Sequence, residues 1–262
     1  MTLSPYGDTA LVGTGQRFVY VLSVHPDPGR TARPVARWRA PGIPESAALA
    51  SERPLALLGT WQKSGVSAFS LDGTPRSLQY EDPEPDRAHA VCLSVDGSTA
   101  VAVSARGPRE SHARVTVWET ETGRRLWSED LDAFRPTALT TDNGDFIAVA
   151  YVKALSYRTG AAVERKLALF DRQGRRLWEK GKLFFSPRLV ALSRDGSRLT
   201  VTDGGDTIYT LDARGHFLSK LHLPAHPGTG IVPGIREVIA SEDGGWLLIH
   251  RGDGQITLLR AT

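Results

Sequence analysis

A five-residue segment, Gly-Arg-Arg-Leu-Trp, occurs twice in the chain, at 123–127 and again at 174–178. An apolar run precedes each copy, at 115–118 in the first case and at 167–170 in the second. Recurrence at a spacing of about fifty residues is typical of folds that stack similar units around a shared core. This repeat therefore constrains the fold more than any single motif in the chain does.

A short turn with Asp or Asn next to Gly marks the start of each unit. Asp and Asn bond to their own backbone, and Gly accepts the positive φ that closes such a turn. Apolar strands follow the turns, without helical periodicity, which favours an all-β fold. The turns lie about 43 to 53 residues apart, close to the length of a four-stranded propeller blade. They are found at 3–8, 93–98, 139–145, 192–197 and 240–245, with a degenerate copy at 49–54.

The sequence predicts an all-β protein, a β-propeller of about six four-stranded blades with an incomplete first and last blade. Few residues precede the first turn, and the last unit ends after its third strand. The junction blades are then short of strands, or an open edge pairs with another chain, or the natural protein is longer. We expect one domain, 1–262, with blades at 1–46, 47–88, 89–135, 136–188, 189–235 and 236–262.

Two features of the repeat resemble known families. The Leu-Ser-x-Asp-Gly turn, as at 93–97, resembles that of WD40-like bacterial propellers, although their Gly-His and Trp-Asp dipeptides are missing from the expected places. The acidic turn followed by Gly-x-x-Leu-Trp resembles the tryptophan-docking motif of quinoprotein-like propellers with PQQ-like repeats. The resemblance implies structural roles for blade-docking and turn residues, namely Trp118, Trp127, Trp178, Asp96, Gly97, Asp195 and Gly196.

The sequence contains few residues in patterns that bind a metal or a cofactor. The quinoprotein enzymes that the resemblance brings in need eight blades, a metal and acidic catalytic residues, and this chain is too short for that set. Its one cysteine, Cys92, lies in an apolar run and excludes a multi-cysteine metal site. We therefore expect no catalytic residues, no metal and no cofactor, and the chain is more simply a non-enzymatic protein.

The irregular connections indicate where a partner would bind. The repeated turns all fall on one face of a propeller, here called the turn face. The longer second-to-third and fourth-to-first connections fall on the other, the irregular face, where binding residues usually lie. Two basic insertions, 104–114 and 151–166, stand out there. They predict partner-binding residues Arg106, Arg109, Arg114, Lys153, Tyr157, Arg158 and Arg165.

Several functions stay open. The leading hypothesis is a scaffold that binds a protein partner through the irregular face. Small-ligand binding or hydrolysis at the axial channel is an alternative, with His89 and Glu237 as candidate residues. Nucleic-acid binding by the basic insertions is another, weakened by the acidic run at 81–86. The same insertions also fit two solvated hairpins with ordinary surface arginines.

The location and assembly of the protein are predicted from simpler features. The chain has neither a signal-peptide pattern at its start nor a long apolar run, so we expect a cytoplasmic protein without a membrane partner. Oligomerisation through open blade edges is the remaining partner hypothesis.

Overall fold

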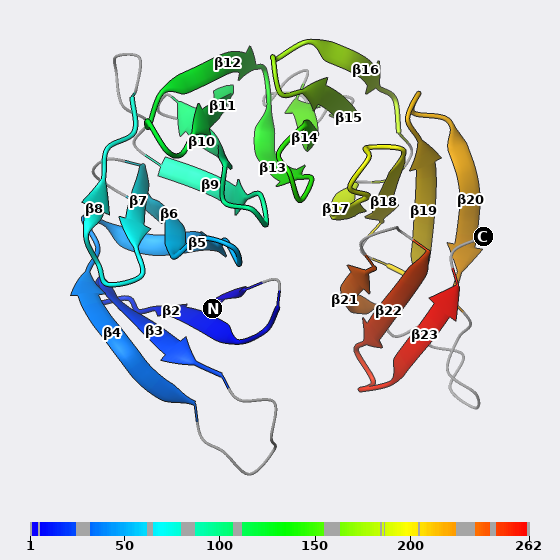
Figure 1. Cartoon of the computed structure of the whole chain (residues 1–262). Coiled ribbons are helices and arrows are strands. Elements are labelled where there is room, and N and C mark those ends of the chain that lie inside the picture. Colours follow the sequence, from blue (N-terminus) through cyan, green and yellow to red (C-terminus); the bar gives the residue numbers. More distant parts are fainter. Residues whose placement is uncertain are drawn as a thin grey trace.

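The computed structural model describes residues 2–4, 6–24, 32–61, 65–79, 87–106, 112–154, 163–183, 185, 187–203, 205–223, 234–241 and 245–260. The side chains at 105–106, 134–135, 154, 163, 236–237 and 239–240 lie outside that description. Within these ranges the chain forms 23 strands and no helix. Each blade is an antiparallel sheet, and the blades are arranged around a central axis (Figure 1).

The first two blades follow each other along the chain. Blade 1 contains β1 (Thr2–Leu3), β2 (Thr9–Gly13), β3 (Phe18–Ser23) and β4 (Arg33–Arg39). Blade 2 contains β5 (Ile43–Leu49), β6 (Leu55–Trp61), β7 (Val66–Ser70) and β8 (Pro75–Arg76). The first blade has an innermost strand after all, although it is only two residues long.

Blades 3 and 4 are the most regular. Blade 3 contains β9 (Arg87–Leu93), β10 (Thr99–Arg106), β11 (His112–Glu119) and β12 (Arg125–Leu131). A single pair, Trp61 with Arg87, joins its sheet to that of blade 2. Blade 4 contains β13 (Phe134–Thr140), β14 (Phe146–Ala154), β15 (Val163–Asp171) and β16 (Arg176–Lys180).

The last two blades differ in strand number. Blade 5 contains β17 (Arg188–Leu192), β18 (Arg198–Thr202), β19 (Thr207–Asp212) and β20 (Phe217–His222). Blade 6 contains β21 (Ile235–Ala240), β22 (Trp246–Arg251) and β23 (Ile256–Arg260). No fourth strand pairs with β23 among the described residues. The predicted all-β propeller is thus the observed fold, with an incomplete last blade among the described residues. The expectation of an incomplete first blade was wrong, because Thr2 and Leu3 suffice to pair with β2 as an innermost strand.

The turns that open the blades are built as the sequence predicts. In blade 3 the Ser94 hydroxyl donates to the Asp96 carboxylate, which accepts the Ser98 backbone N–H at 2.9 Å. Gly97 closes the turn at a φ of 68°. Blade 5 repeats this network with Ser193 and Asp195. These side chains satisfy backbone groups that the short strands leave unpaired.

The apolar core is divided among the blade junctions. Within the described residues, one cluster lies between each pair of consecutive blades. The junction of blades 3 and 4, for example, buries Val117 against Ile147 and Phe170. Each strand therefore buries side chains on both of its faces when a blade has two neighbours.

The motif tryptophans pack onto the next blade. A Cβ on Gly174 would meet the Trp127 ring at 2.7 Å, and one on Gly215 would meet the Trp178 ring at 2.9 Å. Only a glycine accepts both the positive φ and this close approach. Trp38 makes the same contact with Gly73, although blade 1 lacks the full Gly-x-x-Leu-Trp sequence.

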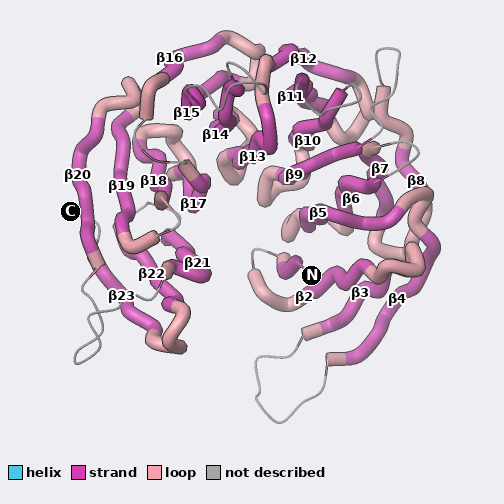
Figure 2. The backbone as a smooth tube through the Cα atoms, turned by 180° about the vertical axis from the view of Figure 1, so that it is seen from behind, coloured by secondary structure: helices cyan, strands magenta, loops and turns pink. Residues whose placement is uncertain are grey.

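The ring of blades is open between its two ends. Consecutive blades contact each other through their innermost strands, from β1 with β5 to β17 with β21. Among the described residues no comparable contact joins β21 to β1, and Figures 1 and 2 both show the opening between blade 6 and blade 1. One face of blade 6 consequently has no neighbouring blade among the described residues.

Candidate functional site

The described parts of the two predicted insertions are paired strands rather than irregular loops. Strands β10 and β11 pair as far as Arg106 with His112, and β14 pairs with β15 as far as Ala154 with Val163. The tips, 107–111 and 155–162, lie outside the described residues. Arg109, Tyr157 and Arg158 belong to these tips, and the Arg106 side chain is likewise undescribed. Their predicted role in partner binding stays a prediction.

Two of the described cationic residues are engaged within the blades. Arg114 donates from Nε and Nη2 to the two carboxylate oxygens of Asp130, each at 2.6 Å. The Lys153 Nζ lies 3.2 Å from Asp132 Oδ2. These acids come from the fourth strand of blade 3 and from the residue that follows it. The sequence did not reveal this neutralisation because the acids lie some twenty residues from the bases.

A carboxylate also organises the base of the second hairpin. Glu179 accepts the Lys166 Nζ and the Tyr151 hydroxyl, each at 2.7 Å. Partial burial opposes ionisation of Glu179, but these hydrogen bonds hold its pKa below the ordinary value. The bond to Glu179 also raises the pKa of Lys166 above its usual value. Arg165, next in the strand, is half-buried rather than displayed.

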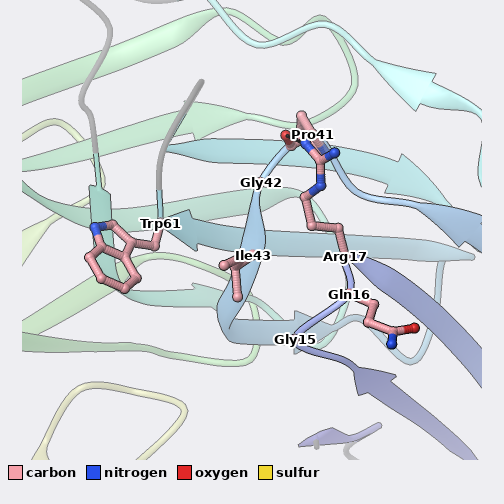
Figure 3. A pocket seen from close by; sticks show the side chains of 7 residues that line it. All are labelled: Gly15, Gln16, Arg17, Pro41, Gly42, Ile43 and Trp61. Carbon is pink, nitrogen blue, oxygen red and sulfur yellow. Dashed lines mark hydrogen bonds between the residues drawn. The ribbon is translucent and has the colours of Figure 1, made fainter.

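A pocket elsewhere on the irregular face is more open to a partner. It has a volume of about 210 Å³ and is built from the β2–β3 turn, the β4–β5 connection and the end of β6. In Figure 3 the Trp61 ring lies on one side of Ile43, and the Arg17 side chain lies on the other. The lining residues are Gly15, Gln16, Arg17, Pro41, Gly42, Ile43 and Trp61.

Two arginines hold the walls of this pocket. Arg17 has a left-handed backbone, with φ at 66°, and donates from Nη1 to the Pro41 carbonyl at 3.2 Å. The Arg87 guanidinium lies 5.4 Å from the centre of the Trp61 ring and pairs with both carboxylate oxygens of Glu45 at 2.8 and 3.0 Å. Trp61 is therefore positioned by a cation–π contact yet remains 47% exposed.

The dimensions and chemistry of the pocket fit one side chain of a partner better than a cofactor. Its volume is below the ~300 Å³ at which small-molecule sites usually begin. Exposed Trp with nearby Arg is the combination that dominates binding energy in protein interfaces. Sequence reasoning missed the pocket, although an aromatic residue at the end of a buried second strand was a signal for it.

The two residues that were candidates for a site at the axial channel come from different blades. His89 lies half-buried on β9, whereas Glu237 lies on β21, across the ring, and its side chain is outside the description. Burial raises the pKa of the Cys92 thiol to about 12, so a thiolate nucleophile does not form there at neutral pH. In the described part of the chain no group of three or more His, Cys, Asp or Glu could hold a metal ion. The same described residues contain no helix long and apolar enough to cross a membrane.

Together the repeat, the blade-docking tryptophans and the ring of sheets define a β-propeller with PQQ-like repeats. The chain belongs to the family described as outer membrane protein assembly factor BamB, whose model matches residues 62–219. The resemblance to quinoprotein-like propellers expected from the tryptophan motif is thereby confirmed. Comparison with curated proteins gives no match.

Solved structures agree on the fold. Hydrazine synthase from Kuenenia stuttgartiensis aligns with a TM-score of 0.70 at 14% identity, over 99% of this chain and 82% of that one. The β-propeller domain of Cps50 (Swd1) from Myceliophteria thermophila aligns with a TM-score of 0.64 at 12% identity, over the same shares of the two chains. At these identities the likeness concerns the fold alone.

Proposed function

We propose that the protein is a non-enzymatic propeller scaffold that binds a protein partner through its irregular face. The observation that carries the proposal is the exposed Trp61 in the wall of a small pocket, where it contacts Arg87 of the Arg87–Glu45 pair. A rigid, half-exposed indole binds a partner at low entropic cost because few of its rotamers remain to be lost.

The description of the family also supports binding of a protein partner. Its description names an assembly factor, and assembly requires contact with another protein. The basic hairpins 104–114 and 151–166 extend the proposed surface on the same face. Because Arg114 and Lys153 are already paired with acids, we expect them to contribute less than Trp61.

The decisive experiment is capture of a partner from extract by the immobilised full-length chain, with captured proteins quantified for each variant. We expect Trp61→Ala to reduce capture of the specific partner at least about tenfold, the loss typical of an interface hot spot. Trp246→Ala is a matched control, since Trp246 is also 47% exposed but lies in blade 6. Equal capture by both variants and the parent chain would refute the proposal.

A second set of variants tests the hairpins and separates protein from nucleic-acid binding. Joint replacement of Arg109, Arg158 and Arg165 by Ala should weaken capture if the tips contact the partner. Nuclease treatment should leave capture unchanged. Capture that disappears with nuclease, and falls steeply with salt, would instead support the nucleic-acid alternative.

A further inference from the structure

Among the described residues, no strand pairs with the outer edge of β23 in blade 6. In blades 1 to 5 a fourth strand occupies the outermost position, whereas β23 occupies only the third and has no described neighbour beyond it. An unpaired strand presents a row of backbone N–H and C=O groups to solvent and is a template for pairing with another strand.

Proteins usually protect such edges with charges, proline or short length. The other outermost strands of this chain carry such features. Strand β8 is only two residues long and contains Pro75. The remaining four each contain charged or titratable residues: Arg33, Arg37 and Arg39 in β4, which also has Pro34; Arg125, Glu129 and Asp130 in β12; Arg176, Glu179 and Lys180 in β16; and Lys220 and His222 in β20. Strand β23 carries a single charge, Arg260, at its last residue. Its central residues offer nothing that opposes pairing.

The hydrogen-bond register shows which groups face outward. The backbone N–H of Arg251 donates to the Gln255 carbonyl at 2.9 Å, so Arg251 and Gln255 form a hydrogen-bonded pair of the antiparallel ladder. Because bonded and non-bonded pairs alternate in an antiparallel ladder, Thr257 and Leu259 bond to β22. The N–H and C=O groups of Ile256, Leu258 and Arg260 consequently point to the open edge.

We infer that a second copy of this chain pairs with β23 in an antiparallel, two-fold arrangement centred on Leu258. Leu258 then lies opposite its counterpart, and Ile256 lies opposite Arg260 of the second copy. Every outward-facing backbone group finds a partner, and the two arginines lie at opposite ends of the pairing, so like charges are not opposed. Such isologous contacts are the commonest form of protein dimer.

The side chains favour the same register. Ile256 and Leu258 are 67% and 61% exposed in the single chain. In the paired sheet the Leu258 side chains contact each other, and the aliphatic stem of Arg260 covers Ile256. The pairing supplies each blade 6 with the fourth strand that the other five blades already have.

The test is the mass of the full chain in solution, measured by light scattering from about 1 to 200 µM, with an expected dimer Kd of order 10 µM because the interface is small. We expect twice 28.5 kDa at the upper end of this range. Leu258→Pro removes an outward-facing N–H and the leucine side chain without removing a hydrogen bond to β22, and it should weaken the dimer at least about tenfold. Leu258→Val keeps that N–H and is the matched control, which should dimerise like the parent.

Two further measurements keep the proposal falsifiable. Should Leu258→Pro lose its circular dichroism signal, Ile256→Lys decides instead, because it adds a charge at an exposed edge position without touching the ladder. Amide exchange at Leu258 should slow as the protein concentration rises. A parent chain that stays monomeric at 200 µM, or a dimer that survives the edge variants with unchanged Kd, would overturn the inference.

Discussion

Blades 4 and 6 are built from the same kind of repeat but differ in what surrounds them. Leu167, on the third strand of blade 4, is fully buried, whereas Leu258, on the third strand of blade 6, is 61% exposed. Blade 4 has a neighbour on both faces, and blade 6 has a described neighbour only in blade 5. The comparison shows that burial in a propeller comes from the adjacent blade and not from the apolar pattern of the strand.

Truncating the two leucines should give the largest difference between the blades. We expect Leu167→Ala to lower the free energy of unfolding by about 3 kcal/mol, since it removes buried surface and leaves a cavity. Leu258→Ala should cost no more than about 0.5 kcal/mol, because solvent already reaches that side chain. Urea unfolding at low protein concentration measures both. Similar losses for the two variants would mean that blade 6 is covered in solution.

The turn glycines provide a second matched pair. Gly174 and Gly254 close turns with the same hydrogen-bond pattern and with φ of 84° and 85°. A Cβ on Gly174 would overlap the Trp127 ring, whereas one on Gly254 would meet nothing within 4 Å. We expect Gly254→Ala to cost about 1 kcal/mol for the left-handed backbone alone, and Gly174→Ala to cost about 2 kcal/mol or more.

Thermal unfolding of the two alanine variants measures this difference, and Gly174→Ala should also change the fluorescence of Trp127. Equal midpoints for the two variants would show that the Trp127 contact with blade 4 adds nothing to stability.

Acid sensitivity should be the smallest of the three effects and should come from the aspartates of the blade-opening turns. Hydrogen bonds from Ser197 and Ser193 hold the pKa of Asp195 below its ordinary value. A carboxylate with a lowered folded-state pKa stabilises the fold above its unfolded pKa, and this contribution is lost as the pH falls through the folded value. We therefore expect the unfolding midpoint to fall as the pH drops below about 4.

Blade 4 contains a natural comparison for this effect. Asn143 occupies the equivalent turn position and accepts the Thr141 hydroxyl at 2.9 Å without a titratable group. Asp195→Asn should accordingly fold at neutral pH with a slightly lower midpoint and show a shallower acid dependence than the parent chain. An unchanged acid profile would exclude Asp195 as a source of the sensitivity.

Much of the fold could be predicted because the repeat encodes local structure. The turn residues Ser94, Asp96 and Gly97 determine one hairpin among themselves, and the spacing of such turns predicts the blades. The proposed binding surface was harder to predict from the sequence. Arg114 was selected for its charge, but its charge is compensated by Asp130 on a neighbouring strand. Trp61 was not selected, although its exposure makes it the strongest candidate.

The sequence by itself determined the all-β architecture, the turn geometry and the spacing of the blades, because each of these follows from residues close in the chain or from the repeat. Only the tertiary structure decided which bases are neutralised, where the Trp61 pocket forms and which strand keeps a free edge. These properties depend on which blades are neighbours, and the free energy of burial or pairing is gained only when the neighbouring surface is present.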